Sequence, residues 1–80
     1  MDAWLEAAVA RLALETGAAV PDYTLTQAEI DELLELARIA AHESGERTNA
    51  PLLCYLVGLA RGRGGHELDD LVDAAAGKRI

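Results

Sequence analysis

Apolar residues recur every three or four positions along most of the chain, which is the spacing of one face of an α-helix. Proline is rare and β-branched residues are few, so the fold class that we expect is all-α. Residues 17–25, which contain Pro21, form the predicted loop after the first helix. Four helices are predicted, from near Asp2 to about Glu15, from Thr26 to before Gly45, from Thr48 or Asn49 to the glycines that begin at Gly62, and from His66 or Glu67 to before Gly77.

The second predicted helix has the clearest start signal. Thr26 and Glu29 have the spacing of a capping box, and Leu25 and Ile30 occupy the two positions of a hydrophobic staple. Gly45 is a natural residue just past its end.

The third predicted helix is apolar around more than half of its circumference, between Leu52 and Ala60. Such a distribution is typical of a helix that is buried on most sides. The pattern therefore predicts a single domain, residues 1–80, that folds as a compact four-helix bundle with a central buried third helix.

Composition limits the classes of partner that the protein is expected to bind. A formal net charge of −7 and an estimated pI near 4.5 argue against broad binding to nucleic acid or to an anionic membrane. The longest apolar run, Pro51 to Ala60, is shorter than the roughly 20 residues that cross a bilayer. Acidic residues near the N-terminus do not fit a secretory signal, and the single Cys54 cannot form an intramolecular disulfide, so we expect a cytoplasmic protein.

Because many of the apolar residues are alanines, the core should be thin, and a protein partner or a second copy is expected to complete it.

Positively charged side chains are concentrated in one window of the sequence. From Arg47 to His66 the chain has three arginines and no acidic residue. At one end of this window Arg47 and Asn49 precede or open the third helix, where free N–H groups can bind an anion. The alternative is that Asn49 caps the helix while Arg47 pairs with a carboxylate such as Glu43.

At the other end of the window, Arg61 and Arg63 lie among glycines. They either complement the negative end of the helix dipole or bind a phosphate or carboxylate group. Because a helix of about a dozen residues separates them from Arg47 by about 18 Å, the window forms two positive spots and not one groove.

The remaining reactive side chains predict neither a metal site nor a cofactor. His42 lacks a second ligand at zinc-binding spacing. It is expected to interact with the dipole at the end of its helix or to anchor the following loop. Tyr55 is expected to pack in the core or to point its hydroxyl at the end of the helix that carries His42. Cys54, inside an apolar helix, should behave as a small hydrophobic residue and not as a nucleophile.

Three apolar side chains lie on or beyond the edges of the main helix stripes. These residues either pack against the long loop or form an exposed patch that recruits a partner. They are Leu14, Leu36 and Ile39.

Several segments resemble a small uncharacterised helical family whose members occur alone or appended to molybdenum-cofactor guanylyltransferases. The segments are Leu33-Leu-Glu-Leu-Ala-Arg-Ile-Ala-Ala-His42, Arg47-x-x-Ala-Pro-Leu52 and Tyr55-Leu-Val-Gly-Leu-Ala-x-Gly-Arg63, with Trp4 near the start of the first helix. The resemblance implies a helical module linked to the synthesis of molybdopterin-guanine dinucleotide, with His42, Arg47 and Tyr55 as the matched positions. The glycine-rich nucleotide-binding segment of the transferase has no counterpart in the chain, so its catalytic activity does not carry over.

The sequence therefore favours a non-enzymatic accessory or protein-interaction module. The alternative is a module that binds a small anion or nucleotide, through Arg47 at a helix N-terminus or through the loop of Arg61 and Arg63.

Overall fold

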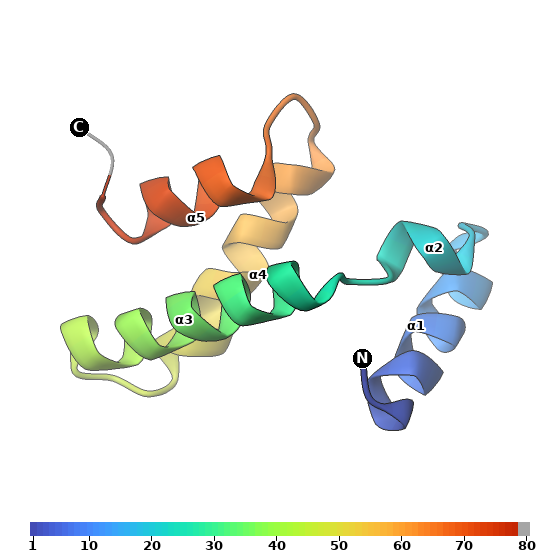
Figure 1. The fold of residues 1–80 in the computed structure, drawn as a ribbon, viewed down its shortest axis with the longest axis horizontal. Coiled ribbons are helices and arrows are strands. Elements are labelled where there is room, and N and C mark those ends of the chain that lie inside the picture. The colour runs from blue at the N-terminus through green and yellow to red at the C-terminus, as the bar shows by residue number, and fades with distance from the viewer. Residues whose placement is uncertain (79–80) are drawn as a thin grey trace.

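The computed structural model describes residues 1–78, and its regular secondary structure there is entirely helical (Figure 1). The all-α fold class is confirmed, with four main helices and one short additional turn of helix. In chain order the elements are α1 (Ala3–Thr16), α2 (Val20–Tyr23), α3 (Gln27–Ser44), α4 (Asn49–Gly62) and α5 (Leu68–Ala75).

The predicted helix ends of α1 and α3 are confirmed by their hydrogen bonds. Asp2 accepts a hydrogen bond of 2.8 Å from the backbone N–H of Leu5, which caps α1. At the start of α3 the capping box forms in both directions between Thr26 and Glu29. Gly45 ends α3 with a positive φ of 75°, a conformation that glycine adopts without steric cost.

The predicted loop of residues 17–25 contains the short helix α2, which the sequence reasoning missed. Pro21 lies in its first turn, and the carboxylate of Asp22 accepts a hydrogen bond of 3.0 Å from the N–H of Ala19. The hydroxyl of Tyr23 donates to the hydroxyl of Thr16 across 2.9 Å, which joins α2 to the end of α1. The loop is therefore an ordered turn that folds back on α1.

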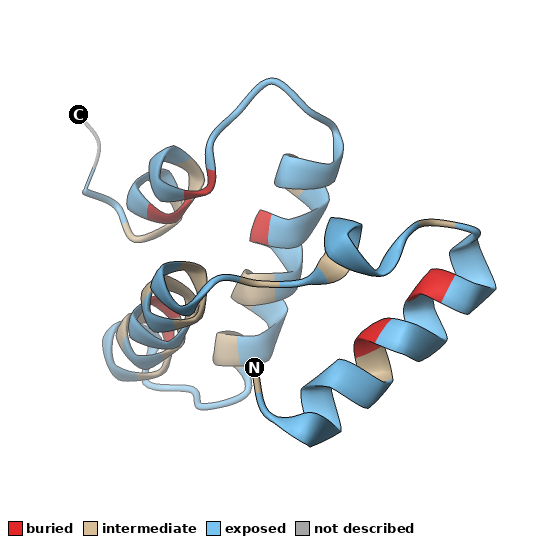
Figure 2. Ribbon diagram, turned by 45° about the vertical axis from the view of Figure 1, so that its right-hand side comes forward, coloured by how far each residue is buried: buried red, intermediate tan, exposed pale blue. Residues whose placement is uncertain are grey.

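The core lies among α3, α4 and α5, which pack against one another in all three pairs. Its centre is the fully buried Leu36 of α3, surrounded by Val57 of α4 and by Leu68 and Val72 of α5 (Figure 2). Burying such aliphatic side chains contributes roughly 1.5–3 kcal/mol each. These three helices form the stable body of the protein.

Helices α1 and α2 form an arm beside this body. Within residues 1–78, α1 packs against α2 and against no other helix (Figure 1). The arm buries Val9 and Ala13, which do not belong to the cluster around Leu36. The predicted bundle is thus a three-helix body and a two-helix arm, joined by residues 24–26.

The third main helix, α4, packs against both α3 and α5, but α3 and α5 each pack against two helices of the body as well, so the contacts do not single out α4 as central. The predicted burial of α4 on most sides is not confirmed. Val57 is its one buried residue among those described, and Leu53 and Cys54 are partly buried. The opposite face of α4 is apolar and exposed, because no helix of the arm covers it.

Candidate functional site

The exposed face of α4 is a continuous apolar stripe. Four side chains follow the i, i+3, i+4, i+7 spacing, so they fall within an arc of about 100° on one side of the helix. They are between 46 and 66 % exposed. This set, the α4 stripe, consists of Leu52, Tyr55, Leu56 and Leu59.

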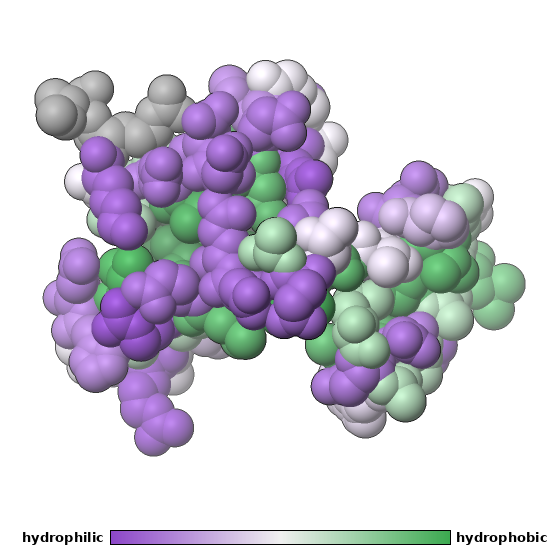
Figure 3. Space-filling model, in the orientation of Figure 1, coloured by the Kyte–Doolittle hydropathy of each residue, from purple (hydrophilic) through white to green (hydrophobic). Residues whose placement is uncertain are grey.

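The arm presents a second apolar stripe of similar length. Trp4, 74 % exposed, lies on the same side of α1 as Leu5 and Leu12, which are also exposed, and as the partly exposed Ala8. These four residues form the α1 stripe. Figure 3 shows the arm as a lobe that stands apart from the body over much of its length. Large exposed apolar areas of this kind are typical of interaction sites.

A groove of about 570 Å³ lies where the arm meets the body. One wall is the segment of residues 21–25, and the other comes from α3, α4 and the start of α5. The polar residues Glu29 and Arg61 are part of its lining, together with the apolar side chains of Leu33 and Val57. The groove is therefore largely apolar, with an ion pair at its edge.

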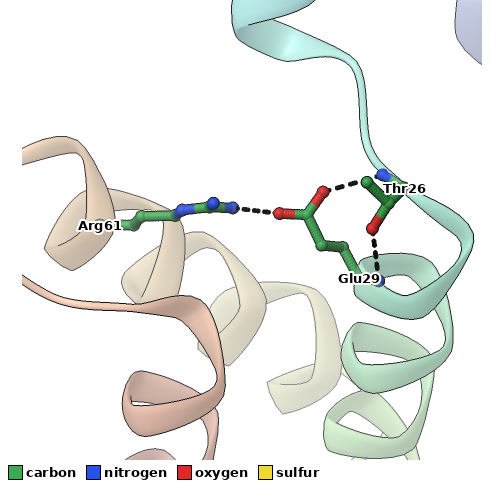
Figure 4. A network of polar contacts seen from close by, with 3 residues as sticks. All are labelled: Thr26, Glu29 and Arg61. Carbon is green, nitrogen blue, oxygen red and sulfur yellow. Dashed lines mark hydrogen bonds and ion pairs between the residues drawn. The ribbon is translucent and has the colours of Figure 1, made fainter.

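This ion pair joins the third residue of α3 to the last turn of α4. Arg61 Nη1 lies 2.7 Å from Glu29 Oε2, while Glu29 Oε1 accepts a hydrogen bond of 2.8 Å from the N–H of Thr26 (Figure 4). The hydrogen bond from the Thr26 backbone and that from Arg61 together lower the pKa of the Glu29 carboxyl. Glu29 thus caps α3 and anchors α4 with one side chain.

Cys54 also lines the groove, but its chemistry is that of a structural thiol. Burial raises its pKa, which lowers the fraction of thiolate at neutral pH. Its Sγ–H points at the carbonyl oxygen of Leu33, 3.8 Å away. This environment agrees with the expectation that Cys54 acts as a small hydrophobic residue.

Arg47, Asn49 and His42 lie near the connection between α3 and α4. Arg47 and His42 are exposed and Asn49 is partly buried. Neither Arg47 nor His42 forms an ion pair within residues 1–78, so the pairing of Arg47 with Glu43 that we considered is absent there.

The start of α4 offers an anion fewer donors than the sequence suggests. Thr48, one of the two predicted caps, occupies the N-cap position of α4, but its side chain makes no capping hydrogen bond. Asn49 is already the first helical residue, so the prediction that Asn49 caps the helix is wrong. The N–H groups of Asn49 and Ala50 donate to the carbonyls of Glu46 and Arg47, each across 3.1 Å. Pro51 has no N–H to donate.

The structure separates the remaining arginines. Arg61 is held by Glu29, which leaves Arg63, at the exposed end of α4, without an ion pair in the described part of the chain. The two arginines are therefore not placed to bind one anion together. Tyr55, another predicted site residue, belongs to the α4 stripe.

The three apolar residues predicted as an interface have different environments. Leu36 is 0 % exposed at the centre of the core, so its assignment to an interface is wrong. It lies at the edge of its own helix stripe, but α4 and α5 both cover that edge. Leu14 is 87 % exposed, and Ile39 is partly buried beside a smaller hollow between α3, α4 and the end of α5.

Sequence reasoning missed the exposed stripes because it treated apolar residues at helical spacing as core. The available signal was the width of the apolar arc of α4. An arc wider than half of the helix holds two separate stripes, and a small body provides partners for one of them.

Residues 1–78 contain neither a membrane-spanning helix nor a cluster of metal-binding side chains. Among residues 1–78, no helix has both the length and the apolar character needed to cross a bilayer. In the same range, no group of three or more histidine, cysteine, aspartate or glutamate side chains is placed to hold a metal ion.

The chain matches the model of a protein family over nearly all of its length. A family model described as Domain of unknown function (DUF6457) matches residues 1–79, which is nearly the whole sequence. No curated protein and no solved structure matches the chain significantly.

Proposed function

Because the chain belongs to the family Domain of unknown function (DUF6457), whose description assigns no activity, we propose a function from its surface: a non-enzymatic protein-interaction module. The observation that carries the proposal is the α4 stripe, an i, i+3, i+4, i+7 row of large apolar side chains on a helix whose other side is already in the core. This spacing is the one that helical partners recognise in a groove or along another helix. The α1 stripe adds a second surface of the same kind.

The chemistry of the polar residues supports a binding role over a catalytic one. The raised pKa of Cys54 disfavours the thiolate that a nucleophile needs, and the Arg61 guanidinium is held by Glu29. Tyrosine, the residue type of Tyr55, is enriched in interfaces, and the leucines beside it gain free energy when their apolar area is buried.

The test is a pull-down with three tagged forms of the chain. We expect the wild type and Leu34→Glu to retain the same proteins, identified by mass spectrometry, and Leu56→Glu to lose them. Leu34 is a matched control because it is an exposed leucine on α3, outside both stripes. The proposal fails if the wild type retains neither another protein nor an untagged copy of itself, or if all three forms retain the same set while circular dichroism shows that each is folded.

The sequence resemblance supports a narrower form of this proposal, in which the module assists a molybdenum-cofactor guanylyltransferase. The matched residues include Tyr55, Leu56 and Leu59, which belong to the α4 stripe. Purified guanylyltransferase from the same organism should bind the wild type and not Leu56→Glu in isothermal titration. No heat of binding with the wild type would end the molybdenum link and leave the interaction module intact.

A further inference from the structure

The chain exposes more surface than a compact protein of its size. Its accessible area is 5959 Å², whereas a compact monomer of 8.5 kDa exposes about 4,650 Å². The excess of about 1,300 Å² is larger than the roughly 800 Å² per partner that a stable complex buries. The radius of gyration, 13.3 Å, likewise exceeds the about 11.6 Å of a compact 80-residue domain.

The two stripes are similar in length. Each spans about two turns of helix, or about 11 Å. Their side chains recur every three or four residues, so the ridges of one helix can pack into the grooves of the other. In one copy of the chain this packing does not form, because α1 does not contact α4.

The two segments that carry the stripes have opposite net charges. Residues 2–16, which include α1, carry three acidic side chains, Asp2, Glu6 and Glu15, and one arginine. The segment from Arg47 to His66, which contains the α4 stripe, carries three arginines and no acidic residue, and one of these arginines, Arg61, is paired with Glu29. Arg63 continues the α4 stripe one turn beyond Leu59. The opposite net charges favour the pairing of α1 with α4 over the pairing of α4 with a second α4.

The connection between arm and body is short, and α1 does not contact the α4 of its own chain. Thr24 is fixed to α2 by its hydroxyl, which donates 2.9 Å to the carbonyl of Val20. Thr26 is fixed to α3 by the capping box with Glu29, which Arg61 holds in turn. Only Leu25 separates these two anchored residues, so the connection is short and is anchored at both of its ends.

We infer that the partner of these surfaces is a second copy of the chain, in a symmetric dimer in which the α1 stripe of each copy packs on the α4 stripe of the other. This inference rests on the proposed interaction function and names its partner. The contact occurs twice in the dimer, and each copy buries both of its stripes.

The experiment uses one variant in each stripe, Leu12→Glu and Leu56→Glu, with Leu14→Glu as the matched control. Leu14 is on α1 but lies about 160° around the helix from Leu12, outside the α1 stripe. Sedimentation velocity should show a dimer for the wild type and for Leu14→Glu. Each stripe variant alone should weaken self-association at least about tenfold, because a buried charge then lies in both contacts.

An equal mixture of the two stripe variants distinguishes this arrangement from other dimers. In the mixed dimer one contact joins two altered stripes, but the other joins two unaltered ones. We therefore expect more dimer in the mixture than in either variant alone. A monomeric wild type, or a mixture that dimerises no better than its components, overturns the inference.

A folding check and a second pair of variants exclude unfolding as the cause of any loss of dimer. Circular dichroism checks that each variant is folded, and the pair Leu5→Gln and Leu52→Gln repeats the test if Leu12→Glu or Leu56→Glu is not. If the wild type is a monomer but retains another protein through the α4 stripe, the dimer is wrong and the interaction function stands. If it neither dimerises nor retains a protein, both are wrong.

Discussion

Arg61 in the last turn of α4 donates a hydrogen bond of 2.7 Å to the carboxylate of Glu29, the third residue of α3. The two residues are far apart in the sequence, and their contact fixes the start of α3 against the end of α4. A double-mutant cycle with Glu29→Gln and Arg61→Met should give a coupling free energy of about 0.2–1 kcal/mol, because both side chains keep some contact with water. Urea denaturation measures it.

The control for this cycle is Arg63→Met, which removes a nearby arginine that has no ion pair among the described residues. Glu29→Gln and Arg63→Met should be additive. Equal coupling for both arginines would show a general charge effect and not a specific contact.

The same carboxylate predicts how stability depends on pH. The pKa of Glu29 is lower in the folded chain than its ordinary value of 4.5, so its contribution is complete above that value. The contribution is lost as the pH falls through the lowered pKa. The free energy of unfolding of the wild type should therefore exceed that of Glu29→Gln at pH 7, and the difference should shrink below about pH 4.5. A difference that stays constant through this range would contradict the assignment.

Glu32 predicts the opposite effect on stability: its replacement should stabilise the fold at neutral pH. Its pKa is raised, first by burial and then by repulsion from Asp69 and Asp73 of α5 and from Glu29. The ionised form is therefore unfavourable in the fold, and Glu32→Gln should increase the melting temperature at neutral pH. The increase should shrink as the pH falls toward and below 4.5, where the wild-type side chain is protonated in both states.

Glu46→Gln is the control for Glu32→Gln, because it removes the same charge from an exposed position in the connection between α3 and α4. It should change the melting temperature less. Equal gains from the two variants would mean that the net charge of the chain, and not the position of Glu32, is responsible.

Two leucines on α3 test the position of the core. Leu36→Ala should lower the free energy of unfolding by about 2–5 kcal/mol, because it leaves a cavity at the centre of the body. Leu34→Ala, two residues away and exposed, should change it by no more than about 0.5 kcal/mol. Chemical denaturation measures both, and similar losses would contradict the burial of Leu36.

Local signals predicted most of the helix ends, because a cap depends on a few neighbouring residues. Thr26 with Glu29, Asp2 and Gly45 all act as their sequence positions indicate. The helix α2 was missed because Pro21 and Asp22 favour a tight turn as well as a first helical turn.

Contacts between distant segments were not predictable in the same way. The pairing of Arg61 with Glu29 depends on how α3 and α4 cross, and the burial of Leu36 depends on α5. For Leu56 and its neighbours, the helical spacing predicts an apolar side of α4. The spacing does not show whether this chain or a second molecule covers that side.

Trp4, the single tryptophan of the chain, reports most directly on whether the two stripes meet. It is 74 % exposed in one copy and belongs to the α1 stripe. We predict that its fluorescence emission shifts to shorter wavelength as the protein concentration rises, returns on dilution, and does not shift in Leu56→Glu. Emission typical of water-exposed indole at every concentration of the wild type would contradict the account.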